Sequence, residues 1–567
     1  MWINSFGYSV FIIFPFTLGL VASSIITGYY FNLDPLLSLL LLTTLFFIFC
    51  KQQPDTIGNH IHISSDVILL LLVSLIFLSL IGGKFVLSPI ISTWDGIVSF
   101  QRWAYELSTN DFTPYGSFYQ VGWPAIWSLF ADAEMYLSTQ FSKIFLIFEK
   151  LTFIFLLASY SQAKIYRLTI SIIFILSLLL INQTWLFSGN IDSSLSFNVV
   201  NVVLCCAFAI HNNSNSLRVT VYINAAVCFF FFSILIKQQI IYVTPILVYS
   251  LWKNNNYKLI DIRTILFCLV CLTGLIFNYI LYLKNRPNEV FDYYSMFLDR
   301  SIERSGPEFI GMLNYAFNKT YDLFINLGNI LLLSIIFWLR IIKKKKNNIF
   351  SNSFIFDFII LLVISVGFCA YSYLFAYDNR GALWMASLLS TLIFINCVRL
   401  DYNFDKKNYI NQLIDVRLNH FQLLVVSLSI IFSSILINSE SSKKLVSSFG
   451  LTGEKGAMLL SEYINKSGNE CLYIINRDQI IKYNSLLIRE KNKINNFNPI
   501  NTLAWNEERI IKFIKENENN DNFQNLYCGY LIYTVNHDNY EQLFNRFELL
   551  NPAKNIFIYR FSNDKKN

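Results

Sequence analysis

The segment RVTVYINAAVCFFFFSILIKQQ, residues 218–239, decides the fold class of this chain. Residues 218–236 can cross a bilayer as one helix, because the hydrocarbon core needs roughly 20 apolar residues. The run ends at Lys237, Gln238 and Gln239, and the next apolar run follows with no room for a real loop. The segment therefore predicts membrane-spanning helices with a cation at the bilayer surface.

The same apolar character extends over the whole chain of 567 residues. It is 54% hydrophobic and only 14% charged, whereas soluble domains carry about 25% charged residues. This composition excludes an ordinary soluble protein and predicts an α-helical polytopic membrane protein. Thirteen apolar runs are candidate transmembrane helices: 8–29, 33–50, 66–86, 144–162, 166–182, 195–211, 218–236, 239–252, 262–283, 326–341, 354–376, 382–398 and 421–438.

Lysine and arginine residues between these runs predict the orientation, because they favour the cytoplasmic side. With the N-terminus in the cytoplasm, most of them, including the run Lys343–Lys346, fall inside. Two long loops, 87–143 and 284–325, then lie on the outer face, as does the tail from residue 439. Lys237 also falls outside, against the trend, so it either snorkels to the interface or serves as a fixed cation.

The tail differs in kind from the apolar runs. Three of its segments, 470–476, 525–535 and 555–561, predict buried strands. Two others, 506–518 and 539–550, predict amphipathic helices. The sequence therefore predicts a small extracytoplasmic α/β domain.

That tail also holds Cys471 and Cys528, which would pair only in an oxidising compartment.

Polar clusters at the predicted outer surface are the candidates for chemistry. A carboxylate such as Asp95 or Asp192 can accept a proton from a hydroxyl nucleophile. A cation such as Lys237 or Arg380 can stabilise a departing phosphate. The segment after Asp95 has helical spacing and is expected to lie along the interface with its aromatic residues at headgroup level.

Each cluster also has a purely structural interpretation. Asp95 would N-cap the helix that follows it, and Asp192 would be an ordinary turn residue. Asp378 and Arg380 would pair within their own turn. The composition alone leaves these alternatives open.

Five stretches, in this order, resemble motifs of bacterial polytopic glycosyltransferases of the GT-C fold. They are WDGIVSFQRWAYEL (94–107), YQVGWPAIWSL (119–129), SGNIDSSLSF (188–197), LIKQQIIY (235–242) and YDNRGALW (377–384). The group is related to the dolichyl-phosphate-mannose protein mannosyltransferases, glycosyltransferase family 39. The chain departs from that pattern at Gln120, where the family commonly has Pro, and around Asp192, which lacks the preceding Tyr-Ala and the following Pro.

The resemblance implies a domain organisation and an activity. Residues 1–65 would be an extra transmembrane hairpin, 66–438 the GT-C catalytic domain and 439–567 a soluble periplasmic domain. Such enzymes sit in the bacterial inner membrane and transfer a sugar from a polyprenyl-phosphate donor to an acceptor hydroxyl, with inversion. The expected acceptor is a cell-envelope glycan or glycolipid, and no nucleic acid is expected.

The resemblance also implies residue roles. Asp95 and Asp192 are expected to be catalytic, and Lys237, Arg380 and Arg102 to bind the donor phosphate. The expected substrate-binding residues are Trp94, Trp103, Tyr119, Gln238, Asp378 and Asn379. No cofactor is required by these roles, although Asp95 and Asp192 together could hold a divalent metal.

Two other functions remain as alternatives. An O-antigen polymerase or ligase would use polyprenyl-diphosphate oligosaccharides and outer loops rich in Arg and His, whereas this chain has five His and none in the clusters. A transporter of lipid-linked glycans would need polar groups along a path through the membrane. The spans are mostly uninterrupted Leu, Ile and Phe, with Glu149-Lys150 the main exception.

Overall fold

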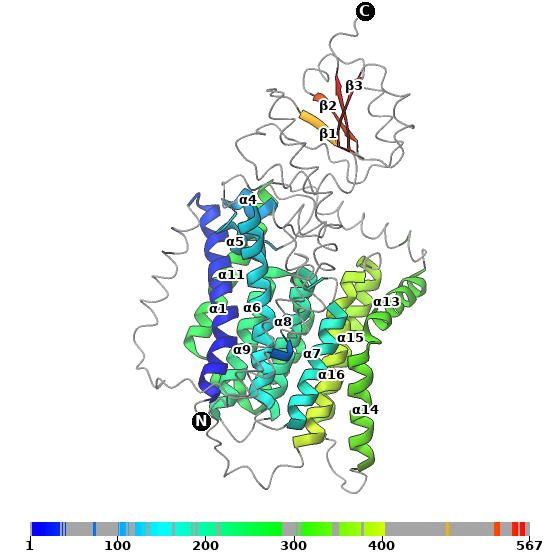
Figure 1. Cartoon of the computed structure of the whole chain (residues 1–567). Helices are drawn as coiled ribbons and strands as arrows, with labels where there is room; N and C mark the ends of the chain where they lie inside the picture. Colours follow the sequence, from blue (N-terminus) through cyan, green and yellow to red (C-terminus); the bar gives the residue numbers. More distant parts are fainter. Residues whose placement is uncertain are drawn as a thin grey trace, which may run out of the picture.

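The structure is a computed structural model in which most of the helical part and four strands of the tail are described. The described residues are 3–33, 37, 40, 72–74, 100, 102–108, 112, 120–131, 135–161, 165–182, 185–186, 191–211, 216–285, 302, 308–342, 351–375, 379–402, 472–475, 527–532, 547–553 and 556–561. Figure 1 shows a body of long helices and a separate small sheet near the C-terminus.

Helices make up the body. The α-helices are α1 (Ile3–Tyr30), α4 (Arg102–Ser108), α5 (Gly122–Ser128), α6 (Met135–Ser161), α7 (Ile165–Asn182), α8 (Ile191–His211), α9 (Ser216–Ile236), α10 (Thr244–Trp252), α11 (Ile262–Asn285), α13 (Phe309–Phe324), α14 (Leu327–Ile342), α15 (Ser351–Phe375) and α16 (Leu383–Tyr402). Three short 3-10 helices connect them: η2 (Gln238–Val243), η3 (Lys253–Leu259) and η4 (Asn379–Ala382).

Several helices are long and apolar enough to cross a membrane. Among the described residues these are the three stretches Ile191–Ile210, Val219–Ile236 and Ile262–Leu283. The pair α13 and α14, bent by 80°, would make a fourth if it forms one span. The chain is therefore a helical membrane protein, as its composition predicts. The number of thirteen spans stays a prediction, and the runs 33–50, 66–86 and 421–438 lie almost wholly outside the described residues.

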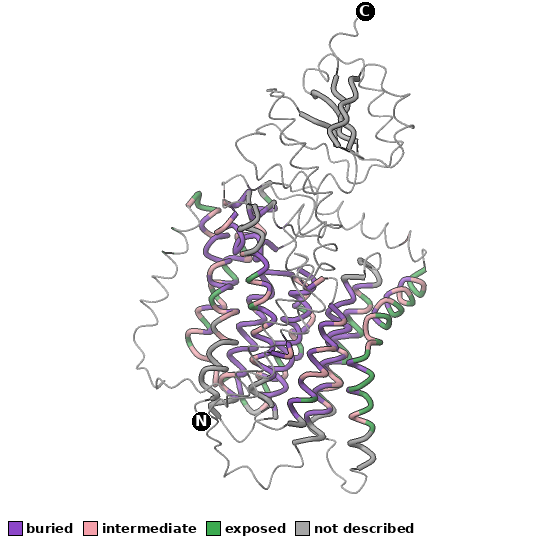
Figure 2. The backbone as a smooth tube through the Cα atoms, in the orientation of Figure 1, coloured by how far each residue is buried: buried purple, intermediate pink, exposed green. Residues whose placement is uncertain are grey.

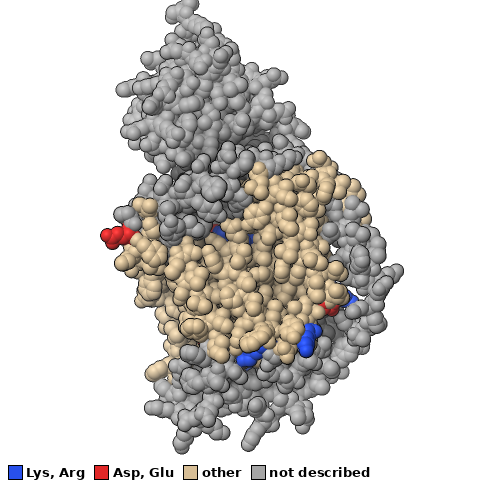
Figure 3. Space-filling model, turned by 180° about the vertical axis from the view of Figure 1, so that it is seen from behind, with Lys and Arg blue, Asp and Glu red and all other residues tan. Residues whose placement is uncertain are grey.

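Burial follows the arrangement expected for a bundle in lipid. Every residue of Ile191–Ile210 in α8 is buried, and Figure 2 shows purple in the centre of the body with green on the outer helices. The outer helices α11, α14 and α15 expose Leu, Ile and Phe, for example Leu269, Phe337 and Phe358. The face in Figure 3 shows few charged groups among the described residues. Such an apolar surface suits contact with acyl chains.

Helix α1 is an integral part of this bundle. It packs against α11, α9, α6 and α5. A Cβ on Gly274 of α11 would lie 2.9 Å from Ser23 Cα of α1, so the small residue permits close approach of the helices. The amide N–H of Phe112 donates to Tyr29 Oη at 2.7 Å, which ties the loop 87–143 to the C-terminal end of α1.

One predicted span differs from the observed helices. The run 239–252 is not one span: it contains η2 and then α10, which begins at Thr244 beside Pro245. The part of the helix expected after Asp95 that the structure describes is α4, whose Trp103 is fully buried against Phe100 and Phe112. That aromatic residue is therefore part of the core, and its expected place at headgroup level stays a prediction.

The tail holds a four-stranded sheet. Its strands are β1 (Leu472–Ile475), β2 (Tyr527–Ile532), β3 (Phe547–Ala553) and β4 (Ile556–Phe561), in the order β1-β2-β4-β3. β1 and β2 are parallel, and the other neighbours are antiparallel. β1, β2 and β4 confirm the three predicted strands.

The helix predicted over 539–550 is wrong where β3 begins. Phe547 and Leu549 alternate with period two and pair with β4, a pattern that favours a strand. The helix predicted over 506–518 lies outside the described residues, so the α/β character of the domain stays a prediction.

Candidate functional site

Asp192 and Lys237, both singled out by the sequence, form an ion pair. Lys237 Nζ donates a hydrogen bond to Asp192 Oδ1. The side chains are almost buried, with 8% of Asp192 and 11% of Lys237 exposed. Because the surroundings are poor in water, the attraction is much stronger than that of a surface pair. Lys237 therefore faces a carboxylate within the protein and does not only snorkel.

The position of Asp192 corrects the sequence prediction. It lies in the first turn of α8, which begins at Ile191, whereas the sequence placed it in a turn before a span starting at residue 195. Polar residues such as Asp and Ser are favoured in the first turn of a helix, so the helix extends beyond its apolar run. The helix dipole also favours a carboxylate at this end.

Lys237 occupies a break between two helices. Its backbone is extended, with φ −157° and ψ 127°, and it separates α9 from η2. The Lys237 N–H still donates to Ser233 O at 2.8 Å, and the Ile240 N–H donates to Lys237 O at 3.3 Å. The main chain of Lys237 is thus hydrogen-bonded to both elements, and its side chain projects from the position directly after the end of α9.

A cluster of amide and phenol groups lies beside this break. The Gln238 N–H donates to Gln120 Oε1 at 3.2 Å, and Gln120 Nε2 lies 3.3 Å from Gln238 Oε1. Tyr279 Oη of α11 donates to Gln238 Oε1 at 3.3 Å. The motif at 119–129 therefore contacts the motif at 235–242 directly.

The motif at 377–384 reaches the same region. Tyr242 of η2 stacks on Trp384 of α16, with ring centroids 5.9 Å apart. The main chain of Asn379 and Arg380 belongs to η4, which contacts α8. Gly381 lies so close to Tyr371 that a Cβ would be 2.3 Å from the ring atom Cε2. A larger residue at this position would therefore require the Tyr371 ring to move.

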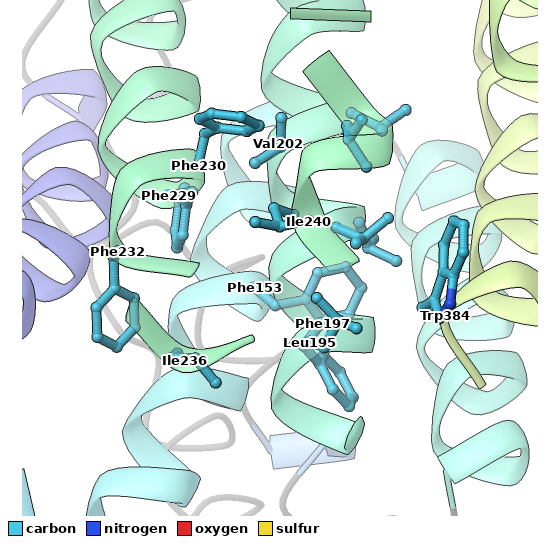
Figure 4. Close-up of a cluster of buried hydrophobic side chains, with 14 of the residues drawn as sticks. Phe153, Leu195, Phe197, Val202, Phe229, Phe230, Phe232, Ile236, Ile240 and Trp384 are labelled. Carbon is cyan, nitrogen blue, oxygen red and sulfur yellow. The ribbon is translucent and has the colours of Figure 1, made fainter. Parts of the chain in front are cut away.

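An apolar layer packs against the first turns of α8. Figure 4 shows Phe153, Leu195 and Phe197 together, with Phe229, Phe230 and Phe232 on one side and Trp384 on the other. Phe153 meets Phe197 edge to face, with ring centroids 5.6 Å apart. These packed rings hold the first turns of α8 in place.

Sequence reasoning missed the contacts of a second charged group, Glu149 and Lys150 of α6. Lys150 Nζ donates to Glu149 Oε2 at 2.5 Å, and both side chains are buried. Ser194 Oγ donates to the same oxygen at 2.9 Å, and Asn198 Nδ2 donates to Glu149 Oε1 at 2.9 Å. Lys150 also lies 5.0 Å from the centre of the Phe197 ring. Glu149 thus ties α6 to the first two turns of α8.

A signal for this contact was present in the sequence. Ser194, Asn198 and Asn201 recur at helical spacing within an apolar run, which indicates a polar stripe that needs a partner inside the membrane. From the sequence, Glu149-Lys150 stands out only as the main exception among the apolar spans.

The remaining predicted site residues are only partly described. Trp94, Asp95, Tyr119 and Asp378 lie outside the described residues. Arg102 is in α4 and Arg380 and Asn379 are in η4, but their side chains are not described. The roles predicted for these residues, and for Trp103 in substrate binding, stay predictions.

Metal binding finds no support in the part of the chain that the structure describes. No three His, Cys, Asp or Glu side chains gather there as ligands would. Asp192 instead contacts a lysine. A two-acid site would also need Asp95, so that site stays a prediction.

Comparison of the sequence with protein-family models finds no match, and comparison with curated proteins finds none. The resemblance to GT-C glycosyltransferases therefore stays a prediction from the five sequence motifs.

Proposed function

We propose that the protein is an inner-membrane glycosyltransferase of GT-C architecture. It would move a sugar from a polyprenyl-phosphate donor to a hydroxyl of a cell-envelope glycan or glycolipid on the outer face. The observation that carries this proposal is the buried contact of Lys237 with Asp192 at the break between α9 and η2. Burying charged groups inside a protein is costly, so a buried ion pair among apolar helices supports a functional role.

The meeting of distant segments supports the proposal. Residues 120–122 contact 235–238, Asp192 contacts Lys237, and η2 contacts α16 through Tyr242 and Trp384. Four of the five motifs thus meet around one end of α8.

The proposed chemistry assigns each group one task. Asp95 accepts the proton of the acceptor hydroxyl, whose oxygen attacks the anomeric carbon of the sugar. The bond from that carbon to the phosphate oxygen breaks, and polyprenyl phosphate leaves with the electron pair. Lys237 and Arg380 stabilise the negative charge that grows on the phosphate. Asp192 keeps the ammonium of Lys237 in place until the phosphate arrives.

The test uses purified protein in liposomes with a set of radiolabelled polyprenyl-phosphate sugars and envelope glycolipid. Wild type is compared with Asp95→Asn, with Lys237→Met and with a matched control, Lys258→Met, whose lysine is exposed on η3. We expect transfer by wild type and control and a loss of at least about 100-fold in Asp95→Asn. Equal transfer by Asp95→Asn would remove this residue as the base. Transfer only from diphosphate-linked oligosaccharides would identify a polymerase or ligase.

A lipid-linked glycan transporter is a second candidate, because polar groups extend into the bundle along α8. Asn198 Oδ1 and both amide atoms of Asn201 are buried without a partner among the described residues. Buried amides of this kind are usually satisfied by internal water. Movement of a fluorescent lipid-linked glycan across liposomes, without sugar transfer, would favour this function.

A further inference from the structure

The orientation of Lys237 depends on a main-chain break that α9 and η2 do not stabilise by themselves. A helix end leaves N–H groups without intrahelical partners, and each needs another acceptor when it is buried. At this break the first N–H of η2 belongs to Gln238, directly after the lysine. The group that accepts a hydrogen bond from this N–H therefore fixes the backbone position from which the Lys237 side chain projects.

Gln120 is that group. Its Oε1 accepts from the Gln238 N–H at 3.2 Å, while its Nε2 lies 3.3 Å from Gln238 Oε1 and 3.5 Å from Tyr279 Oη. Both ends of one amide thus hold one residue, through its main chain and its side chain together. Only 2% of Gln120 is exposed, so water competes little for these bonds.

The segment that carries Gln120 is itself fixed against the end of α9. A Cβ on Gly122 would lie 2.4 Å from Leu235 O, so the two main chains touch. Leu235 is two residues before Lys237. Gln120 therefore reaches the break from a rigid support.

We propose that Gln120 is a positioning residue for Lys237. By holding Gln238 it sets the extended backbone of Lys237 and directs the ammonium toward Asp192 and the donor phosphate. The effect of Gln120 on sugar transfer rests on the proposed function, whereas its effect on the orientation of Lys237 does not.

The first test measures the accessibility of residue 237 and needs no enzyme assay. Lys237→Cys is treated with a water-soluble maleimide, and modification of residue 237 is followed by peptide mass spectrometry. Gln120→Met in this background should raise the modification rate about tenfold, as expected when one hydrogen bond holds a site closed. The matched control is Gln239→Met, since Gln239 Oε1 has no partner among the described residues. An equal rate with and without Gln120→Met would overturn the proposal.

The second test reads the catalytic consequence. Gln120→Met should raise the KM for the donor about tenfold with a smaller change in kcat, and Gln120→Glu, which keeps an acceptor for the Gln238 N–H, should recover part of it. In a Lys237→Met background Gln120→Met should have no further effect, because the residue acts through the lysine. Additive effects would contradict the proposal. A changed labelling rate in a protein that transfers no sugar would leave the positioning role intact and remove the glycosyltransferase proposal.

Discussion

Gly122 of α5 touches the carbonyl of Leu235 at the end of α9, and a Cβ at this glycine would lie 2.4 Å from that oxygen. The contact joins two segments that are far apart in the sequence. We expect Gly122→Ala to destabilise the protein by about 1–3 kcal/mol, because the main chains would have to separate. Thermal unfolding in detergent measures this. Ser334→Ala, on the exposed face of α14, serves as the control with little expected change.

Removal of one member of the ion pair is predicted to cost more than removal of both. Lys237→Met leaves the carboxylate of Asp192 buried without this partner, which typically costs about 3–5 kcal/mol. The double variant Asp192→Asn with Lys237→Met should recover most of that stability but not sugar transfer. Thermal unfolding and the transfer assay separate the two effects. Full stability of the single variant would show that the pair is not buried as described.

Glu149 is predicted to hold α8 in place. Glu149→Gln keeps the size of the side chain but leaves Lys150 without its anionic partner. The expected loss is about 3–5 kcal/mol, which Lys150→Met in the same protein should partly restore. The control is Glu308→Gln, on an exposed residue before α13. Similar unfolding temperatures for Glu149→Gln and Glu308→Gln would contradict this role.

The 80° bend between α13 and α14 is predicted to depend on Asn329. Asn329 Nδ2 donates to Phe324 O at 2.7 Å, and Ser177 Oγ of α7 donates to Asn329 Oδ1 at 2.7 Å. Asn329→Leu removes the hydrogen bonds to Phe324 O and from Ser177 Oγ. The angle between α13 and α14 should then vary more widely, and the protein should lose about 1–3 kcal/mol of stability. Spin labels at the exposed positions of Phe317 and Leu333 report the distance distribution across it. An unchanged distribution would assign the bend to other contacts.

The side of the membrane on which the tail lies can be tested without substrate. Leu472 pairs with Tyr527 in the parallel strands β1 and β2. Cys471 directly precedes Leu472, and Cys528 directly follows Tyr527. In an oxidising periplasm we expect a disulfide between them, visible by non-reducing peptide mass spectrometry. Two free thiols in protein from an oxidising compartment would count against the pairing. Alkylation of both by a membrane-permeant reagent alone would place the tail in the cytoplasm.

Much of the fold could be predicted, because long apolar runs leave a chain little choice but helices in a bilayer. Helix ends were harder. Asp192 was placed in a turn because its neighbours are turn residues, although the same residues are favoured in a first helical turn. The run 239–252 is divided into η2 and α10, and periodicity gives no sign of such a division.

The candidate site was predicted as separate residues and not as contacts. Asp192 and Lys237 are 45 residues apart in the sequence. Asp192 lies at the start of α8 and Lys237 directly follows the end of α9, and a short connection joins these two consecutive helices. Such helices run antiparallel, so the start of one and the end of the next meet at one surface. That geometry could have been inferred. The contact of Glu149 with Asn198 could not, because it depends on how α6 and α8 are rotated against each other.

The complete burial of α8 has a consequence for how the protein is made. Ser196 of α8 lies 2.6 Å from Ser387 of α16, and 191 residues separate the two in the sequence. A ribosome therefore completes α8 long before its polar neighbour exists. Until α16 arrives, the serine and asparagine side chains of α8 have to be kept from lipid by α6, α7 and α9 or by the insertion machinery. Truncated chains that stop before residue 383 should consequently be degraded faster than the full chain, even with α8 and Lys237 intact.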